Sequence, residues 1–322
     1  MSVHWSERPE GGGRFALWLI RTIGLRLGRR VARLVLYPVT LYFFLRRPFE
    51  RRVSRAFLSR AFGRPASAWQ VLRHIHRFAG TMLDRVFLLT DRYARLDVRV
   101  HGLDELLSRL RPDRGVLLLG AHVGSFEVLR VLPGEREVRV CVVLDTQKTP
   151  ALTSLLHELN PTIAANVIDG ARPGTEIVLA LAEALHGGAI ATLLADRSRP
   201  HESTVDAQFM GAPAPFPIAP FLLGSVLEVP LVLCLGLYRG GNRYDIHFEP
   251  FADDLVLPRR TRDRELAALV QRYASRLEHH VRQDPYNWFN WHDFWNCDRM
   301  APAPAAGVPA AGDLAGSTRG LA

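Results

Sequence analysis

Short apolar runs that alternate with helix-like segments are the feature that most restricts how this chain can fold. Between residues 116 and 194, runs with the length of buried strands are separated by segments whose apolar residues recur at helical spacing. The expected strands are 116–119, 139–144, 165–168 and 189–194, and the expected helices start at Ser125 and cover 150–159 and 175–186. This alternation predicts an α/β fold with a mainly parallel central sheet flanked by helices.

Further elements are expected on both sides of this core. They are a largely helical stretch at 54–89 with a break at Pro65, strands at 95–100, 231–238 and 244–248, and helices at 103–110, 218–227 and 262–283. No linker divides this region. We therefore expect three parts, which are an N-terminal membrane-associating helical region (1–53), an α/β domain (54–299) and a disordered tail (300–322) rich in alanine, proline and glycine.

The most informative motif is GAHVGSFE at residues 120–127, where a strand is expected to end. Residues five apart in one α-helix are rotated by roughly 140°, so His122 should lie in the turn and Glu127 on the following helix. From there the carboxylate can reach one imidazole nitrogen and leave the other to act as a general base. Gly124 allows a tight bend, and the amides of residues 124–127 are candidates to bind an oxyanion or a phosphate. The alternative is a polar strand end whose histidine only caps a helix.

These residues resemble the H-x4-D/E block of the lysophospholipid acyltransferase superfamily, and more closely its lipid A biosynthesis (lauroyl/myristoyl) branch. Three further segments are similar to that branch, namely AIATLLADRSRP at 189–200, QFMGAPAPFPIAPFLL at 208–223 and the strand-like 229–232. His4-Trp5, Glu10-Gly11 and the aromatic YNWFNWHDFW near the C-terminus resemble a bacterial subgroup of predicted acyltransferases, so the resemblance covers residues 4–297. Two positions depart from the branch, since Ser125 and Ala219 stand where asparagine and glycine are common.

The resemblance implies a membrane-associated enzyme that moves a fatty acyl chain to a hydroxyl of a lipid or glycolipid. His122 and Glu127 would be the catalytic pair, and no acyl-enzyme intermediate would be needed. The donor would be an acyl carrier protein or coenzyme A thioester, which is a substrate, and no cofactor is expected. The location would be the cytoplasmic face of the bacterial inner membrane. Two alternatives stay open, which are a glycerophospholipid or amino-acid lipid as acceptor, and a lipid-binding protein without turnover.

Candidate substrate-binding residues follow from the expected strand ends and from the resemblance. In a parallel sheet, ligands gather beyond the carboxyl ends of the strands, where Asp196 and Arg197 should lie. The planar guanidinium of Arg197 suits a phosphate, Arg199 is a weaker candidate for the same role, and Asp196 is expected to position Arg197 or an acceptor hydroxyl. A local salt bridge is the alternative for this pair. The complete candidate set for substrate binding is Gly124, Ser125, Asp196, Arg197, Arg199, Phe209 and Phe216, of which the two phenylalanines line an acyl groove or simply pack in the core.

The first 53 residues mix arginine with apolar residues in a way that is typical of a membrane-surface helix. The net charge is +9, and only one of the 41 basic residues is a lysine. The arginines expected on an anionic membrane surface are Arg21, Arg26, Arg29, Arg30 and Arg33. The apolar run at 34–45 has twelve residues and contains Pro38, whereas a span needs about 20. We therefore rank an interfacial anchor first, a single span second and a core helix third, and we expect no cleaved signal peptide.

Other chemistries lack their motifs. There is no G-x-S-x-G elbow, P-loop or paired-cysteine metal site, and no metal is expected. The odd number of cysteines (Cys141, Cys234 and Cys297) favours reduced, buried thiols. Because the aromatic residues are not interleaved with a compact basic patch, nucleic acid is not an expected partner.

Overall fold

The structure is a computed structural model that describes residues 13–90, 96–131, 138–198 and 202–295. Four features singled out from the sequence lie outside these residues, namely the motif around His4, Arg199, Cys297 and the tail at 300–322. The predicted division of the chain into three parts stays a prediction.

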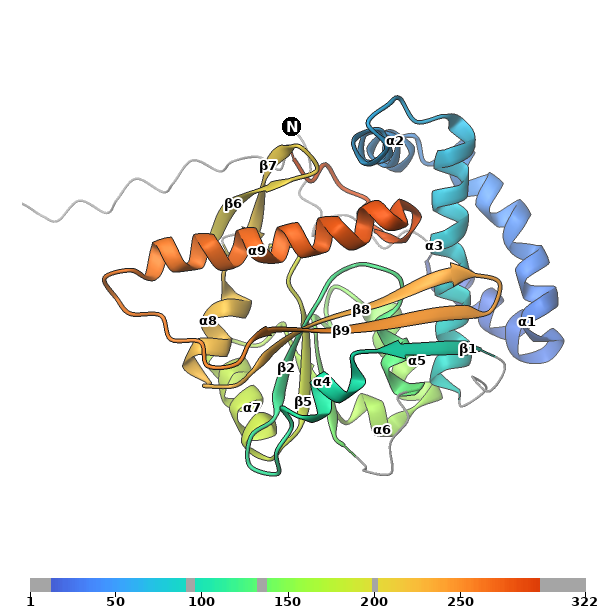
Figure 1. The fold of residues 1–322 in the computed structure, drawn as a ribbon. Coiled ribbons are helices and arrows are strands. Elements are labelled where there is room, and N and C mark those ends of the chain that lie inside the picture. The colour runs from blue at the N-terminus through green and yellow to red at the C-terminus, as the bar shows by residue number, and fades with distance from the viewer. Residues whose placement is uncertain (1–12, 91–95, 132–137, 199–201, 296–322) are drawn as a thin grey trace, which may run out of the picture.

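A seven-stranded sheet forms the centre of the described chain (Figure 1). Its strands, in spatial order, are β1 (Asp97–His101), β9 (Arg243–Ala252), β8 (Leu231–Gly240), β2 (Val116–Gly120), β5 (Ile190–Leu194), β3 (Val140–Leu144) and β4 (Val167–Asp169). Every neighbouring pair is parallel except β8 and β9, which form an antiparallel hairpin. The predicted α/β fold with a mainly parallel sheet is confirmed.

Helices connect and cover these strands much as their periodicity predicts. They are α4 (Leu103–Leu107), α5 (Pro150–Leu159), α6 (Pro161–Ala164), α7 (Gly174–His186), α8 (Ala219–Val226) and α9 (Arg262–Gln283). One segment differs from expectation, because the helix predicted from Ser125 is a short 3-10 helix, η3 (Phe126–Val131). An antiparallel hairpin of β6 (Thr204–Phe209) and β7 (Ala212–Pro217), which no strand prediction covered, includes part of the segment 208–223.

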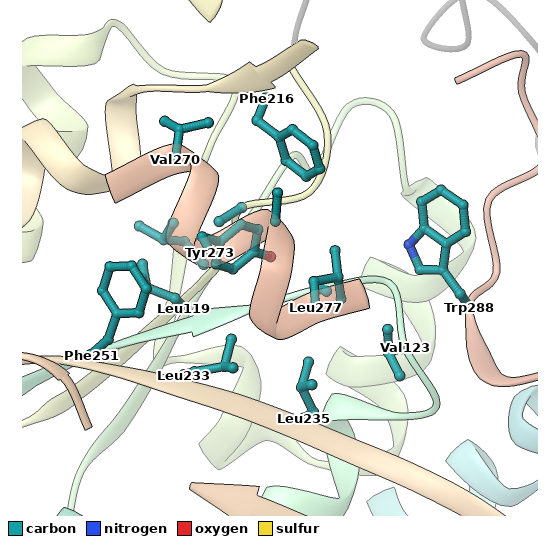
Figure 2. Packing of buried hydrophobic residues seen from close by; sticks show 14 of the residues in the cluster. Leu119, Val123, Phe216, Leu233, Leu235, Phe251, Val270, Tyr273, Leu277 and Trp288 are labelled. Carbon is teal, nitrogen blue, oxygen red and sulfur yellow. The ribbon is translucent and has the colours of Figure 1, made fainter. Parts of the chain in front are cut away.

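The main core lies between the sheet and helix α9 (Figure 2). Leu119 of β2 and Leu233 and Leu235 of β8 face Tyr273 and Leu277 of α9. The alternate residues of the same strands pack in a second cluster with residues of α3 (Ala68–Leu89) and α4. Because both faces are covered, the central strands are apolar throughout, as is typical of parallel sheets.

Three N-terminal helices lie beside the sheet, namely α1 (Gly13–Arg46), α2 (Pro48–Phe62) and α3. The break predicted at Pro65 is real, because α2 ends at Gly63 in the left-handed conformation and Ser67 caps α3 by accepting the Gln70 amide. Helix α1 packs along α3, and Gly28, with a φ of 80°, bends it. Within the described residues, no helix has both the length and the apolar character needed to cross a bilayer.

The structure corrects the expected role of two arginines of α1. Arg29 and Arg33 were expected on a membrane surface, but both side chains turn inward and form ion pairs with Asp84 of α3, which is fully buried. The Tyr244 hydroxyl also donates to this carboxylate. A buried carboxylate needs such partners, so these arginines join α1 to the domain. The thiols of Cys141 and Cys234 are buried and free, as predicted.

Candidate functional site

The turn after β2 is held in place by backbone contacts on two sides. Gly124 has a φ of 62°, and a Cβ at this position would lie 1.9 Å from the carbonyl oxygen of Gly236. Its amide donates to the carbonyl of Asn287 at 2.8 Å, and the Ser125 amide donates to the carbonyl of Gly236 at 2.9 Å. The predicted need for glycine at position 124 is therefore confirmed. Because both amides are already paired, they are not available to bind an oxyanion in this conformation.

This turn brings His122 to the end of a neighbouring strand. In the parallel register of β2 and β5, Gly120 is opposite Leu194, so His122 and Asp196 each follow by two residues the paired ends of their strands. The imidazole Nδ1 lies 2.7 Å from Oδ1 of Asp196, and the backbone N–H of His122 donates to Oδ2 at 3.0 Å. Asp196 is fully buried, whereas the His122 side chain is 29% exposed. The strand ends thus form a histidine–carboxylate pair open to solvent on the histidine side.

Trp288 also contacts Asp196. Its indole Nε1–H donates to Oδ2 at 3.0 Å, and the ring is fully buried among Phe57, Phe209 and Phe294. In the sequence, Trp288 is one of several aromatic residues in the C-terminal segment, and it was not among the candidate site residues. The contact could not be predicted, because no local pattern shows which tryptophan of the C-terminal segment lies beside Asp196, 92 positions earlier in the chain.

The charges around the pair favour a neutral imidazole and an ionised carboxylate. Burial lowers the pKa of His122, and the positive charge of Arg197 lowers it further, while Asp196 acts in the opposite direction. Burial raises the pKa of Asp196, but the charge and hydrogen bonds of His122 and the charge of Arg197 outweigh it, so this pKa lies well below its ordinary value. With Asp196 accepting at Nδ1, Nε2 carries the free lone pair and can take a proton from a ligand.

The structure corrects the partner expected for the imidazole. The Glu127 carboxylate was predicted to orient His122, but it pairs with Arg85 of α3 and accepts the Ser125 hydroxyl at 2.6 Å. Glu127 is 5% exposed, and burying a carboxylate to this extent costs free energy unless it is paired, as it is here. The two residues of the H-x4-E pattern lie in one turn without a hydrogen bond between their side chains, and Asp196 occupies the place expected for Glu127.

The other candidate residues divide into two groups. Arg197 stays near the site, because its charge acts on His122 and its Nη2 donates to the carbonyl of Phe289 at 2.5 Å. Phe209 and Phe216 are fully buried, and their rings pack on each other and on Phe294 in the core. This arrangement corresponds to the packing alternative for the two phenylalanines, so their contact with an acyl chain stays a prediction.

Comparison with known proteins identifies one family that covers most of this chain. The profile of a protein family described as bacterial lipid A biosynthesis acyltransferase matches residues 13–296. The match includes the turn at 120–127, the strand end at Asp196 and the C-terminal Trp288. A search of curated proteins found no match to this chain.

Proposed function

Because this chain belongs to the bacterial lipid A biosynthesis acyltransferase family, and is thus an acyltransferase, we propose that it transfers a fatty acyl chain from a thioester to a hydroxyl of a lipid or glycolipid. In this proposal His122 is the general base, and Asp196 is the carboxylate that orients it. One observation carries the assignment of the pair, namely the 2.7 Å contact between Nδ1 of His122 and Oδ1 of Asp196. A carboxylate at Nδ1 fixes the tautomer and leaves Nε2 to accept a proton.

The proposed reaction is a direct transfer. Nε2 of His122 takes the proton of the acceptor hydroxyl as its oxygen attacks the thioester carbonyl. The new C–O bond forms, the C–S bond breaks, and the protonated imidazole returns its proton to the departing thiolate. Asp196 stays ionised throughout and stabilises the imidazolium, because its charge and its hydrogen bond at Nδ1 favour the protonated ring.

Two nearby residues have supporting roles in this proposal. Glu127 keeps the turn in place through Arg85 and Ser125 and acts on His122 only through the backbone. Arg197 supplies positive charge beside the imidazole, where a thioester oxyanion or a phosphate of either substrate would lie. The latter role suits a donor that carries phosphopantetheine, as both acyl carrier protein and coenzyme A do.

The membrane location and the donor also belong to the proposal. The family suggests association with a membrane, where lipid acceptors reside, and we propose the cytoplasmic face of the bacterial inner membrane. The strongly basic chain, with a net charge of +9, would favour the acidic acyl carrier protein over a neutral partner.

Thiol release from acyl carrier protein and coenzyme A thioesters, with a total lipid extract as acceptor, tests the proposal. New acylated lipids are identified by mass spectrometry, which names the acceptor by its mass. The expected result is an acylated lipid formed by the wild type and absent with His122→Ala. If a folded His122→Ala variant forms the product at the wild-type rate, the base assignment is wrong. If lipid binds but neither donor is consumed, the chain is a lipid-binding protein on this fold.

A further inference from the structure

Helix α1 has two apolar faces, and only one of them is covered by the protein. Ala32, Leu36 and Thr40 are buried, and the cluster formed by Ala32 and Leu36 includes Leu83 and Phe87 of α3. On the same side, Arg29 and Arg33 reach the buried Asp84. This inner face explains why α1 packs along α3 on the outside of the domain (Figure 1).

The outer face of α1 is a continuous apolar stripe that faces solvent. After the bend at Gly28, most of its members recur at intervals of three or four residues, as required for one side of a helix; Tyr42 lies next to Leu41, and Leu27 precedes the bend. Each member is between 40% and 67% exposed. They are Leu27, Val31, Leu34, Tyr37, Leu41, Tyr42 and Leu45. Single exposed leucines are ordinary, but seven large apolar side chains along one helix form a patch that usually marks a binding surface.

Charge at the margins of the stripe indicates what covers it. Helix α1 contains no acidic residue, and Arg26, Arg30 and Arg46 beside the stripe are exposed. Arg52 and Arg55 on the adjoining helix α2 are exposed as well. An apolar strip bordered by arginines alone is complementary to a bilayer with anionic headgroups, since the apolar residues enter the acyl boundary and the guanidiniums meet phosphates.

We propose that this outer face docks the protein on an anionic bilayer, with the part of α1 that follows the bend at Gly28 lying in the membrane plane. A spanning orientation does not fit the packed helix. Lipid could surround α1 only if the buried ion pairs of Arg29 and Arg33 with Asp84 were broken. The inference deepens the proposed function, since it supplies the surface from which a lipid acceptor is reached. It does not depend on the chemistry at His122, because binding is measured without turnover.

Vesicle flotation of the full chain tests this proposal, with phosphatidylcholine vesicles that contain or lack phosphatidylglycerol. The variant is Leu34→Glu/Leu41→Glu, and the matched control is Leu179→Glu/Val226→Glu, which changes two exposed apolar residues on α7 and α8. We expect the stripe variant to lose at least about tenfold in partitioning to anionic vesicles, while the control binds like the wild type. Thermal unfolding midpoints of both variants should stay near that of the wild type, because all four positions are exposed.

Three results would overturn the docking surface. The first is flotation of the stripe variant at the wild-type level. The second is resistance of the bound wild type to alkaline carbonate extraction. The third is that the wild type forms a dimer, the stripe variant is a monomer, and neither protein binds vesicles. The last result would assign the stripe to a second copy of the chain. Turnover with a detergent-dispersed acceptor separates the two proposals, because the stripe variant should keep it and His122→Ala should lose it while still floating.

Discussion

His122 and Asp196 each follow by two residues the paired ends of adjacent parallel strands, and their side chains meet with 2.7 Å between Nδ1 and Oδ1. The relationship joins residues that are 74 positions apart in the chain. It also decides which carboxylate acts on the imidazole.

Asp196→Asn should lower turnover by about 10²- to 10⁴-fold with little change in fold. Oδ2 accepts the His122 amide and the Trp288 indole, so the amide oxygen of asparagine should take that place. The amide NH2 then faces Nδ1 and favours the wrong imidazole tautomer. Steady-state rates of thioester cleavage with a lipid acceptor, together with circular dichroism, measure the effect. Activity within twofold of the wild type would show that Asp196 does not orient the base.

Glu127→Gln should act mainly on stability. It leaves Arg85 without its ionic partner in a mostly buried position, which should cost about 3 kcal/mol. The double variant Glu127→Gln/Arg85→Gln should recover part of this loss, because no charge is then left unpaired. Denaturant unfolding measures the stability, and kcat should fall much less than in Asp196→Asn. If Glu127→Gln is stable but as inactive as His122→Ala, Glu127 and not Asp196 is the carboxylate that supports the base.

The pH profile should report the lowered pKa of His122. The base works as neutral imidazole, so the acid limb of kcat/KM should lie below pH 6.5, the ordinary value for histidine. Arg197→Gln removes a positive charge that opposes protonation, so the limb should move to higher pH. The measurement is kcat/KM for both proteins over a range of about pH 4.5 to 9, which covers the acid limb and the plateau above it. A limb that stays in place or moves to lower pH would contradict the electrostatic role of Arg197.

Gly124→Ala should destabilise the protein by about 3 kcal/mol or more. The position has a φ of 62°, and the new methyl group would lie 1.9 Å from a backbone oxygen, which cannot move aside like a side chain. Gly174→Ala is the control, because nothing lies within 4 Å of a Cβ at the start of α7. Thermal or urea unfolding should show a large loss for the first variant and none for the second.

Acid should weaken the fold through His74. Its ring is fully buried, with Nδ1 near the Ser54 hydroxyl and Nε2 near the carbonyl of Trp288, and burial lowers its pKa to about 4. Since the unfolded chain binds this proton near pH 6.5, stability should fall between pH 6.5 and 4 by about 3 kcal/mol from this group. His74→Gln should be less stable at neutral pH but should show a shallower loss over that range. Equal pH slopes for both proteins would contradict this account.

The local patterns of the sequence were enough to predict the main elements of the α/β core. Period-two and period-3.6 spacing are local properties, so the strands at 116–119 and 189–194 and the helices at 150–159 and 175–186 appear close to their predicted positions. The turn at His122 and the need for glycine at 124 were likewise readable, because a strand end and a tight bend depend on neighbouring residues.

The order of the strands in the sheet, in contrast, could not be predicted from those local patterns. Residues near in sequence made Glu127 the natural partner of His122, but β2 pairs with β5 and β8, and that choice brings Asp196 to the imidazole and leaves Glu127 to Arg85. The two faces of α1 show the same limit. The mixture of arginine and leucine is visible in the sequence, but only packing against α3 decides that Arg29 and Arg33 turn inward and Leu34 and Leu41 outward. The sequence determined which segments form and which groups they carry, because propensity and periodicity act within a few residues. The tertiary structure alone decided which groups meet, because those contacts depend on the pairing of strands and helices that are distant in the chain.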